Sequence, residues 1–574
     1  MTTLTRPILL TLVWFLSLSA SSTADELTVY VAKEIVTMDP SMPKATMVAV
    51  RDDRIVAVGS LETLRPWLDA HDYRIDETFN SHVLFPGFID PHLHPGFAAS
   101  LLHRNHIITA EDWELPTGTV QGVPDRESYF ARLRSLISQS EDTNEPFFTW
   151  GWNSYWHGPL TRDDLDHVSK TRPIVVTQRS AHEVILNTAA LNTMNIGPEV
   201  EERNLPGVDW KAGRFWEAGQ SIVRQAINAL VQNNNDADGL SLVANLIHRG
   251  GVTTIADPGT APTVGSAGWN RLQKTFDTEH TPFRTLLFPR ATSYSVRPGT
   301  TLIDKFERAT SVNTSRLMFR KGVKHFADGA MFAQYMQLSE PGYIDGHKGE
   351  WLTPPEQLEP EIAPFWKAGF DINIHVNGDR GVDVTLNALD TLLHETPRFD
   401  IRYILQHFGI SRPDQARRAG RLGATVSATG YYLWLLGDKW SAVGIGPDRA
   451  DRMIRLGTLV RNGVVVTLHS DLPMGPVRPL LAVWSVVTRK TSSGTVRGPE
   501  EALTLDQALK AITIDAAWSL RMDHEIGSIA PGKKADFVVL DKNPYSVAID
   551  DVKDIHIWGT VFEGTVYPAM TTAN

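Results

Sequence analysis

Eight short apolar segments, separated by segments with the helical spacing of apolar residues, occupy most of the chain between residues 82 and 520. This alternation constrains the fold most, because strands that alternate with helices form parallel sheets covered by those helices. Eight such units predict an α/β fold, a (β/α)8 TIM-type barrel. The predicted strands are residues 82–90, 251–257, 283–288, 322–329, 370–375, 401–407, 424–429 and 463–471. Predicted helices include 353–369 and 504–520, the latter with Thr504 as its N-cap.

One interval between predicted strands is too long for a single helix. About 155 residues, positions 95–250, separate the first two strands, and a compact domain rarely contains a loop of that length. We therefore expect an inserted subdomain that forms a lid over the mouth of the barrel.

The first 26 residues, "MTTLTRPILLTLVWFLSLSASSTADE", have the features of a secretory signal peptide. Arg6 precedes a mostly apolar run at 8–18, and small residues at 22–24 resemble a cleavage site. An uncleaved anchor is the alternative, although the run is shorter than the ~20 residues that span a bilayer. We expect an exported protein, periplasmic or secreted, with no membrane span after signal cleavage.

Apart from the predicted signal peptide, both ends of the chain show the alternation of apolar and polar residues that is typical of strands. Residues 26–60 contain "LTVYVAKEIVTM" and "ATMVAVRDDRIVAVGS", and the C-terminal region contains "ADFVVLDKN" and "IHIWGTVFEGTVYP". We expect both ends to build one small β domain, a β-sandwich. The predicted divisions are a signal peptide at 1–24, the small β domain at 25–82 and 520–574, and the barrel at 83–519 with its insertion at about 95–250.

Composition excludes several functions. The net charge is −11 and no block of basic residues occurs, which argues against a nucleic-acid partner. The chain has no cysteine, so a thiolate metal site and a cysteine nucleophile are both excluded. The assembly state stays open, with a homodimer among the alternatives.

Polar residues gather at the ends of the predicted strands. These ends carry the groups of an active site in a (β/α)8 barrel. They hold Asp90, His92, His94, Lys324, Asp328, His375, His407 and Asp471. Four histidines and a carboxylate at one mouth suit one or two divalent metal ions, zinc above all.

Lys324 fits such a site only if it loses its proton, after which its amine can take up carbon dioxide and become a bridging carbamate. Lys321, or a Lys324 paired with Asp328, are alternatives.

Taken in chain order, these motifs resemble the metal-dependent amidohydrolase superfamily. The resemblance rests on "FPGFIDPHLH", "KHFADG", His375, His407, "SDLP" at Asp471 and the C-terminal passage at 512–544. Within that superfamily, the long insertion, "WGWNSYWHG" and "SAHEVILNTAAL" resemble the branch that includes N-substituted formamide deformylases.

The resemblance implies a binuclear centre. His92, His94 and Asp471 would hold one metal, His375 and His407 the other, and an N6-carboxylated Lys324 would bridge them. Water activated by the metals would attack a carbonyl, with Asp471 as general base and then acid. The implied activity is hydrolysis of a C–N bond in a small-molecule amide, N-acyl or N-formyl compound, other than a peptide bond. The alternatives are an ester, lactone or carbamate hydrolase, and a non-catalytic regulatory metal-binding homologue.

Three residues of the insertion are candidates for substrate binding. The resemblance suggests that His182 reaches over the metals, with a structural histidine as the alternative. Trp152 and Trp156 belong to an aromatic segment that would form either a substrate wall or core. His469, two residues before Asp471, is either a supporting donor to Asp471 or a barrel histidine one layer below it.

Overall fold

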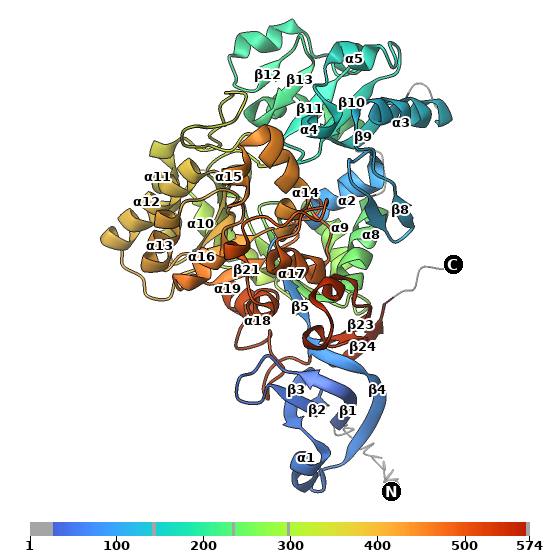
Figure 1. Cartoon of the computed structure of the whole chain (residues 1–574), viewed down its shortest axis with the longest axis vertical. Coiled ribbons are helices and arrows are strands. Elements are labelled where there is room, and N and C mark those ends of the chain that lie inside the picture. Colours follow the sequence, from blue (N-terminus) through green and yellow to red (C-terminus); the bar gives the residue numbers. More distant parts are fainter. Residues whose placement is uncertain (1–26, 141–144, 232–235, 295–298, 570–574) are drawn as a thin grey trace, which may run out of the picture.

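The structure is a computed structural model that describes residues 27–140, 145–231, 236–294 and 299–569 (Figure 1). The predicted signal peptide at 1–24 lies outside the described residues. A sheet built from both chain ends lies at the bottom of Figure 1, the inserted sheet lies at the top, and the parallel strands lie between them. Within the described ranges, no helix combines the length and apolar character needed to cross a membrane.

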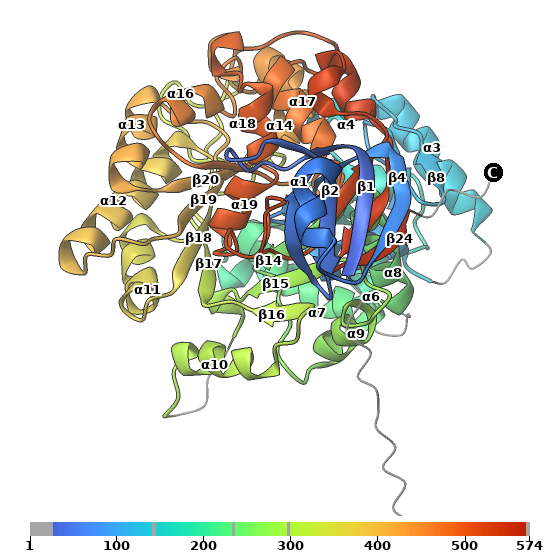
Figure 2. The same ribbon diagram turned by 90° about the horizontal axis from the view of Figure 1, so that it is seen from below.

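Strands from both ends of the chain share one seven-stranded sheet, seen from below in Figure 2. Its order is β24 (Thr565–Pro568), β23 (Ile557–Phe562), β22 (Phe537–Leu540), β4 (Tyr73–Pro86), β1 (Leu27–Val36), β2 (Lys44–Arg51) and β3 (Arg54–Gly59). The pairing of β4 with β22 joins the two ends. Alternate residues of β1 face two apolar clusters, with Val29 in one and Tyr30 in the other, so both faces of the sheet are packed. The structure thus has one continuous sheet where a β-sandwich was predicted.

The predicted central strands form two parallel sheets. One has the order β16 (Leu317–Phe319), β15 (Arg284–Phe288), β14 (Val252–Pro258) and β5 (Phe88–Asp90). The other has the order β17 (Gly322–Phe326), β18 (Asp371–Val376), β19 (Tyr403–His407), β20 (Thr425–Ala428) and β21 (Val466–Leu468). Arg290 and Lys324 form a parallel bridge between the sheets, and Asp471 N donates to His92 O over 3.0 Å beyond the ends of β21 and β5. The two sheets therefore contact each other at two places, beyond the end of β15 at β17 and beyond the ends of β21 and β5.

Each predicted strand overlaps an observed one, but the first is divided. Residues 82–86 complete β4 in the terminal sheet, and β5 begins in the parallel sheet after Gly87. A Cβ at Gly87 would lie 2.1 Å from Thr253 Oγ1, so only glycine allows the chain to pass this close to β14.

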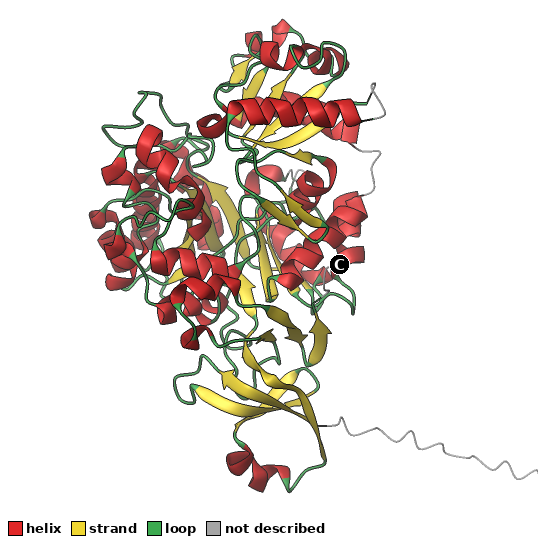
Figure 3. Cartoon of the chain, turned by 45° about the vertical axis from the view of Figure 1, so that its right-hand side comes forward, coloured by secondary structure: helices red, strands yellow, loops and turns green. Residues whose placement is uncertain are grey.

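Helices cover the parallel strands, as the red ribbons around the yellow strands in Figure 3 show. They include α9 (Ala267–Phe276), α10 (Leu302–Ala309), α11 (Pro355–Lys367), α12 (Asp379–Glu395), α13 (Pro413–Leu422), α14 (Gly430–Lys439), α15 (Pro447–Ala450), α16 (Leu456–Arg461) and α17 (Pro479–Thr488). The helix predicted at 353–369 corresponds to α11.

The helix predicted at 504–520 is two helices, α18 (Leu505–Lys510) and α19 (Ile514–Ser519). Thr504 caps α18 as predicted, by accepting from Gln507 N. The break has a tertiary cause. Ala511 O accepts from Leu468 N and Ile512 O accepts from Ile89 N, so these carbonyls pair with the ends of two strands instead of continuing a helix.

The inserted segment has its own sheet and helices. The sheet order is β12 (Val208–Asp209), β13 (Arg214–Trp216), β11 (Glu183–Leu186), β10 (Ile174–Gln178), β9 (Phe147–Trp152) and β6 (His106–Ile107). Its helices include α2 (Pro95–Arg104), α3 (Arg126–Gln139), α4 (Ser154–His157), α5 (Arg162–Asp166), α6 (Thr188–Thr193), α7 (Gln220–Val231) and α8 (Asp236–Arg249). Because α2 packs on α8, the two ends of the insertion lie together.

Candidate metal centre

Three ligand atoms form a small triangle where the parallel sheets meet. His92 Nε2 lies 3.2 Å from His94 Nε2 and 3.4 Å from Asp471 Oδ1, and His94 Nε2 lies 3.5 Å from the same oxygen. A tetrahedral ion with metal–ligand bonds of about 2.1 Å separates its ligand atoms by about 3.4 Å. The three edges match that spacing and leave a fourth position open.

Hydrogen bonding prepares these side chains as ligands. His94 donates from Nδ1 to Asp257 Oδ1 over 3.1 Å, so its Nε2 carries the free lone pair. His92 is fully buried, and its Nδ1 has no hydrogen-bond partner among the described residues. That nitrogen is not the Nε2 of the triangle, so the fit to an ion rests on the spacing of the three ligand atoms and on their donor types.

A second set of potential ligands consists of His92, His407 and His469, all buried. His469 Nε2 lies 3.3 Å from His407 Nδ1, and His407 Nδ1 lies 3.6 Å from Asp471 Oδ2. The sequence predicts His469 to be either a supporting donor to Asp471 or a barrel histidine one layer below it. The structure instead places it among the potential ligands, next to both His92 and His407.

Lys324 and His375 lie in the same region but have other partners. The Lys324 side chain is buried and its Nζ donates to Gln406 Oε1, and burial lowers the pKa of Lys324 to about 7. The His375 ring lies 4.5 Å from that of His407, while its Nε2 is 2.9 Å from the Asn377 side-chain amide. Among the described residues, His375 joins neither group of close histidine and carboxylate ligand atoms.

Burial also sets the charge of the cluster. Removal from water lowers the pKa of His92, His375, His407 and His469 well below the ordinary value, so these imidazoles are neutral. Neutral imidazole is the form that binds a metal. Burial raises the pKa of Asp471, because its negative charge is stabilised less well away from water.

The backbone is unusual at two of these residues. His407 has φ +73° and Asp471 has φ +56°, in the left-handed region that residues with a side chain seldom adopt. Phe408 N donates to Val376 O and Asp471 N donates to His92 O, and these bonds hold both turns in place. Such conformations concentrate at functional sites, where neighbouring contacts maintain them.

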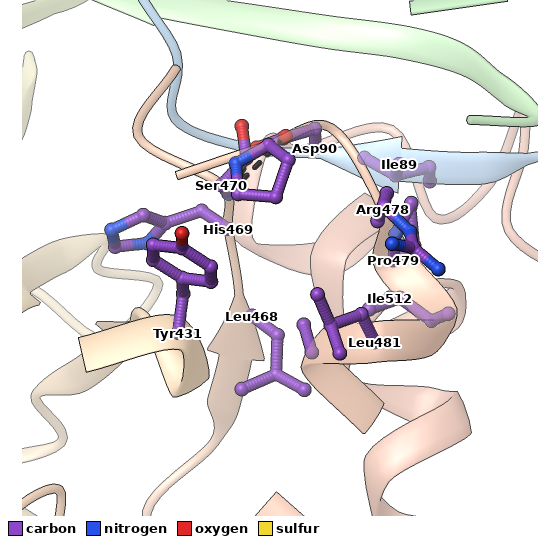
Figure 4. A pocket seen from close by; sticks show the side chains of 12 residues that line it. Ile89, Asp90, Tyr431, Leu468, His469, Ser470, Arg478, Pro479, Leu481 and Ile512 are labelled. Carbon is purple, nitrogen blue, oxygen red and sulfur yellow. Dashed lines mark hydrogen bonds between the residues drawn. The ribbon is translucent and has the colours of Figure 1, made fainter. Parts of the chain in front are cut away.

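Asp90 fastens the two strand ends to each other. Its carboxylate accepts from Ser470 N at 3.2 Å and from His92 N at 3.3 Å, as the sticks in Figure 4 show for Ser470. Burial raises the pKa of Asp90 to about 7. The cavity beside it, about 20 Å³, has room for about one water molecule and is too small for a substrate.

Two contributors to this site were missed in the sequence. Asp257 orients His94, and Tyr432 donates its hydroxyl hydrogen to Asp471 Oδ2 over 2.9 Å. Asp257 ends the predicted strand at 251–257, and this position at a strand end could have marked it as a site residue. Tyr432 lies on α14 within the aromatic "GYYLW", which carries no such signal.

Of the three candidates for substrate binding, the structure brings His182 to the cluster. Its ring lies 5.8 Å from that of His375, and its Nδ1 donates to the Glu217 carboxylate over 2.9 Å. Trp152 is 2% exposed in the core of the inserted segment, which matches the core alternative. Trp156 is half-buried, with Lys439 Nζ 5.4 Å from its ring.

A family model described as "Amidohydrolase family" matches residues 81–567, which is most of the chain. The chain belongs to the amidohydrolase family. This amidohydrolase is 26% identical over 540 residues to protein LONG AFTER FAR-RED 3 of Arabidopsis thaliana, covering 90% of this chain and 88% of that protein. It is 24% identical over 555 residues to the N-substituted formamide deformylase of Arthrobacter pascens, covering 92% and 96%.

A solved structure supports the fold of this amidohydrolase. The crystal structure of an uncharacterized metal-dependent hydrolase from Pyrococcus horikoshii OT3 superposes with a TM-score of 0.68 and 20% identity, covering 92% of this chain and 99% of that one. The chain is therefore a hydrolase of the metal-dependent amidohydrolase superfamily, with histidine and aspartate groups suited to a metal.

Proposed function

We propose that this amidohydrolase cleaves a C–N bond, other than a peptide bond, in a small-molecule amide, N-acyl or N-formyl compound. The observation that carries the proposal is the triangle of His92, His94 and Asp471 ligand atoms, with edges of 3.2 to 3.5 Å. The chain's similarity to an N-substituted formamide deformylase favours an N-acyl substrate. We further propose that the two parallel sheets close into one barrel whose mouth carries this site.

Zinc fits the donors best, since neutral imidazoles and a carboxylate are its usual nitrogen and oxygen ligands. A divalent ion held there lowers the pKa of water and polarises a carbonyl group. The resemblance assigns a second ion to His375, His407 and an N6-carboxylated Lys324. In support, Lys324 is buried, a setting that favours an uncharged amine able to react with carbon dioxide.

We propose that Asp471 moves the proton. Oδ1 faces the two histidines of the triangle, while Oδ2 accepts from Tyr432 and lies near His407. A carboxylate in this position takes a proton from the attacking water and returns it to the leaving nitrogen. The Tyr432 hydroxyl holds the carboxylate in one orientation throughout.

His182 acts from the inserted segment, which we propose covers the mouth as a lid. Because the Glu217 carboxylate accepts from Nδ1, Nε2 of His182 is left to contact the substrate carbonyl or leaving group. Trp156 is the remaining candidate for an aromatic wall beside the substrate. We also propose that the protein is exported.

Hydrolysis screening of metal-loaded protein tests this function. We expect release of amine or formate from members of a panel of N-acyl and N-formyl amines, and no release after Asp471→Asn. Turnover of esters, lactones or carbamates alone would favour the alternative substrate class. No turnover in any class, with metal bound, would favour a non-catalytic protein. Metal analysis of wild type and Lys324→Ala tests the bridging lysine, since about one ion per chain in both would exclude it.

A further inference from the structure

His469 is the one residue of the two ligand groups that the resemblance gives no role. It lies one residue after β21, is 2% exposed, and stacks on His92 with ring centroids 4.6 Å apart. A histidine that only filled space one layer below the site would not need to stack on His92. Its position beside two other imidazoles, those of His92 and His407, therefore calls for an explanation.

A contact with Ser427 sets the orientation of the His469 ring. Nδ1 lies 2.8 Å from the Ser427 hydroxyl on β20, which fixes the ring and directs Nε2 toward His407 Nδ1. Asp471 Oδ2 lies 3.6 Å from the same His407 nitrogen. Two nitrogens and a carboxylate oxygen thus lie close together, and each nitrogen carries a lone pair in one of the two tautomers of its ring.

The spacing suits a cation there. The separation of 3.3 Å between His469 Nε2 and His407 Nδ1 is close to the ~3.4 Å edge of a tetrahedral coordination shell. The ligand atoms of His92, His407 and His469 all lie within 4.8 Å of one another. Lys324 Nζ contacts Gln406 and His375 Nε2 contacts Asn377, whereas Nε2 of His469 faces Nδ1 of His407 directly.

We propose that His469 is a metal ligand of this protein, in a three-histidine set with His92 and His407. The proposal rests on the metal dependence in the proposed function, but it differs from the resemblance, which gives His92 and His407 to different ions, by placing both at one ion with His469. Ser427 is then a positioning residue, because it holds the imidazole with Nε2 toward the ion.

Cobalt(II) binding to the full chain tests the proposal. Purified protein is stripped with a chelator and titrated with Co²⁺, and both the bound metal per chain and the visible absorption spectrum are measured. His469→Gln keeps the length and polarity of the side chain but removes the imidazole nitrogen. We expect it to weaken one binding event at least a hundredfold and to change the Co²⁺ absorption bands.

His325→Gln is the matched control, because His325 is also buried, at 3% exposure, and belongs to neither ligand group. It should leave the Co²⁺ spectrum unchanged. Circular dichroism in the near ultraviolet confirms that each variant is folded, and a misfolded Gln variant is replaced by His469→Asn. An unchanged spectrum in the folded variant overturns the proposal, whether or not affinity falls, because weaker binding alone indicates a supporting role.

The outcomes separate this inference from the proposed function. Wild-type protein that binds no Co²⁺ overturns both. Wild-type protein that binds metal and hydrolyses amides, with a His469→Gln spectrum identical to its own, overturns the His469 proposal alone. An altered variant spectrum without any amide hydrolysis by wild type supports the ligand and overturns the proposed function.

Discussion

Tyr432 donates its hydroxyl hydrogen to Oδ2 of Asp471 over 2.9 Å, while Oδ1 of the same carboxylate faces His92 and His94. The residue thus joins α14 to the strand end that carries the proposed proton acceptor. Asp471 is held in a left-handed backbone conformation, so this side-chain bond is part of what defines the direction of its carboxylate.

Tyr432→Phe should lower kcat by about tenfold to a hundredfold, because a hydrogen bond to a charged group contributes about 1.5–3 kcal/mol. Metal content should stay near that of wild type, since both histidines of the triangle remain. Steady-state kinetics and metal analysis of the same samples measure the two effects. Tyr431→Phe is the control, because the Tyr431 hydroxyl points to Glu111 instead. Equal loss in both variants would contradict a specific role for Tyr432.

Asp257→Ala should weaken metal binding by about tenfold to a hundredfold, which is the usual effect of removing the carboxylate that orients a ligating histidine. The physical reason is that His94 Nδ1 loses its acceptor and the ring is free to turn. Competition with a fluorescent chelator measures the affinity. Thr260→Val removes the hydroxyl that also donates to Asp257 and should have little effect. An Asp257→Ala protein with wild-type affinity would contradict this account.

Arg179→Met should destabilise the protein by about 3–5 kcal/mol, because it leaves the buried Glu111 carboxylate without its cation. The guanidinium also donates to the carbonyls of Pro473 and Met474, just after Asp471, at 3.2 and 3.0 Å. We therefore expect kcat to fall as well. Urea unfolding and kinetics measure these effects.

The double variant Arg179→Met with Glu111→Gln separates the two roles of Arg179. Removing the stranded charge should restore much of the stability, but not the position of the loop after Asp471. Full recovery of kcat together with stability would show that Arg179 serves folding alone.

His157 should make the inserted segment less stable in acid. Its Nδ1 accepts from Asn153 N and its Nε2 donates to Val123 O, so both nitrogens are used in the neutral form. Burial lowers the pKa of His157 to about 4 in the folded chain. The unfolded chain, with a pKa near 6.5, binds the proton more readily, so stability is present above pH ~6.5 and is lost as pH falls toward 4.

The loss should be roughly 3 kcal/mol over that interval, from about 1.4 kcal/mol per pKa unit. Hydrogen exchange of β9 at pH 7 and pH 5 follows it, corrected for intrinsic exchange rates. His157→Gln should be less stable at pH 7 and should show a smaller change between the two values. The same pH dependence in that variant would assign the effect to other groups.

Strand and helix periodicity predicted much of the central architecture. Each of the eight predicted strands overlaps an observed strand, and Thr504 caps a helix as expected. The prediction of one helix at 504–520 was wrong, because the carbonyls of Ala511 and Ile512 accept hydrogen bonds from strands that are distant in the chain. The local sequence pattern does not reveal such bonds. Trp152 was ambiguous for a similar reason, since an aromatic side chain suits a core and a substrate wall equally well.

The amino-acid sequence by itself determined which side chains stand at strand ends, since a two-residue period sets the face that each occupies. His92, His94, His407 and Asp471 were all found in this way. Only the tertiary structure decided which of their atoms meet. Those distances depend on how the ends of β5, β19 and β21, which are far apart in the chain and belong to two sheets, are brought together, and on partners such as Asp257, Tyr432 and Ser427. That placement brought His469, which the sequence suggested was a supporting or structural residue, into contact with His407.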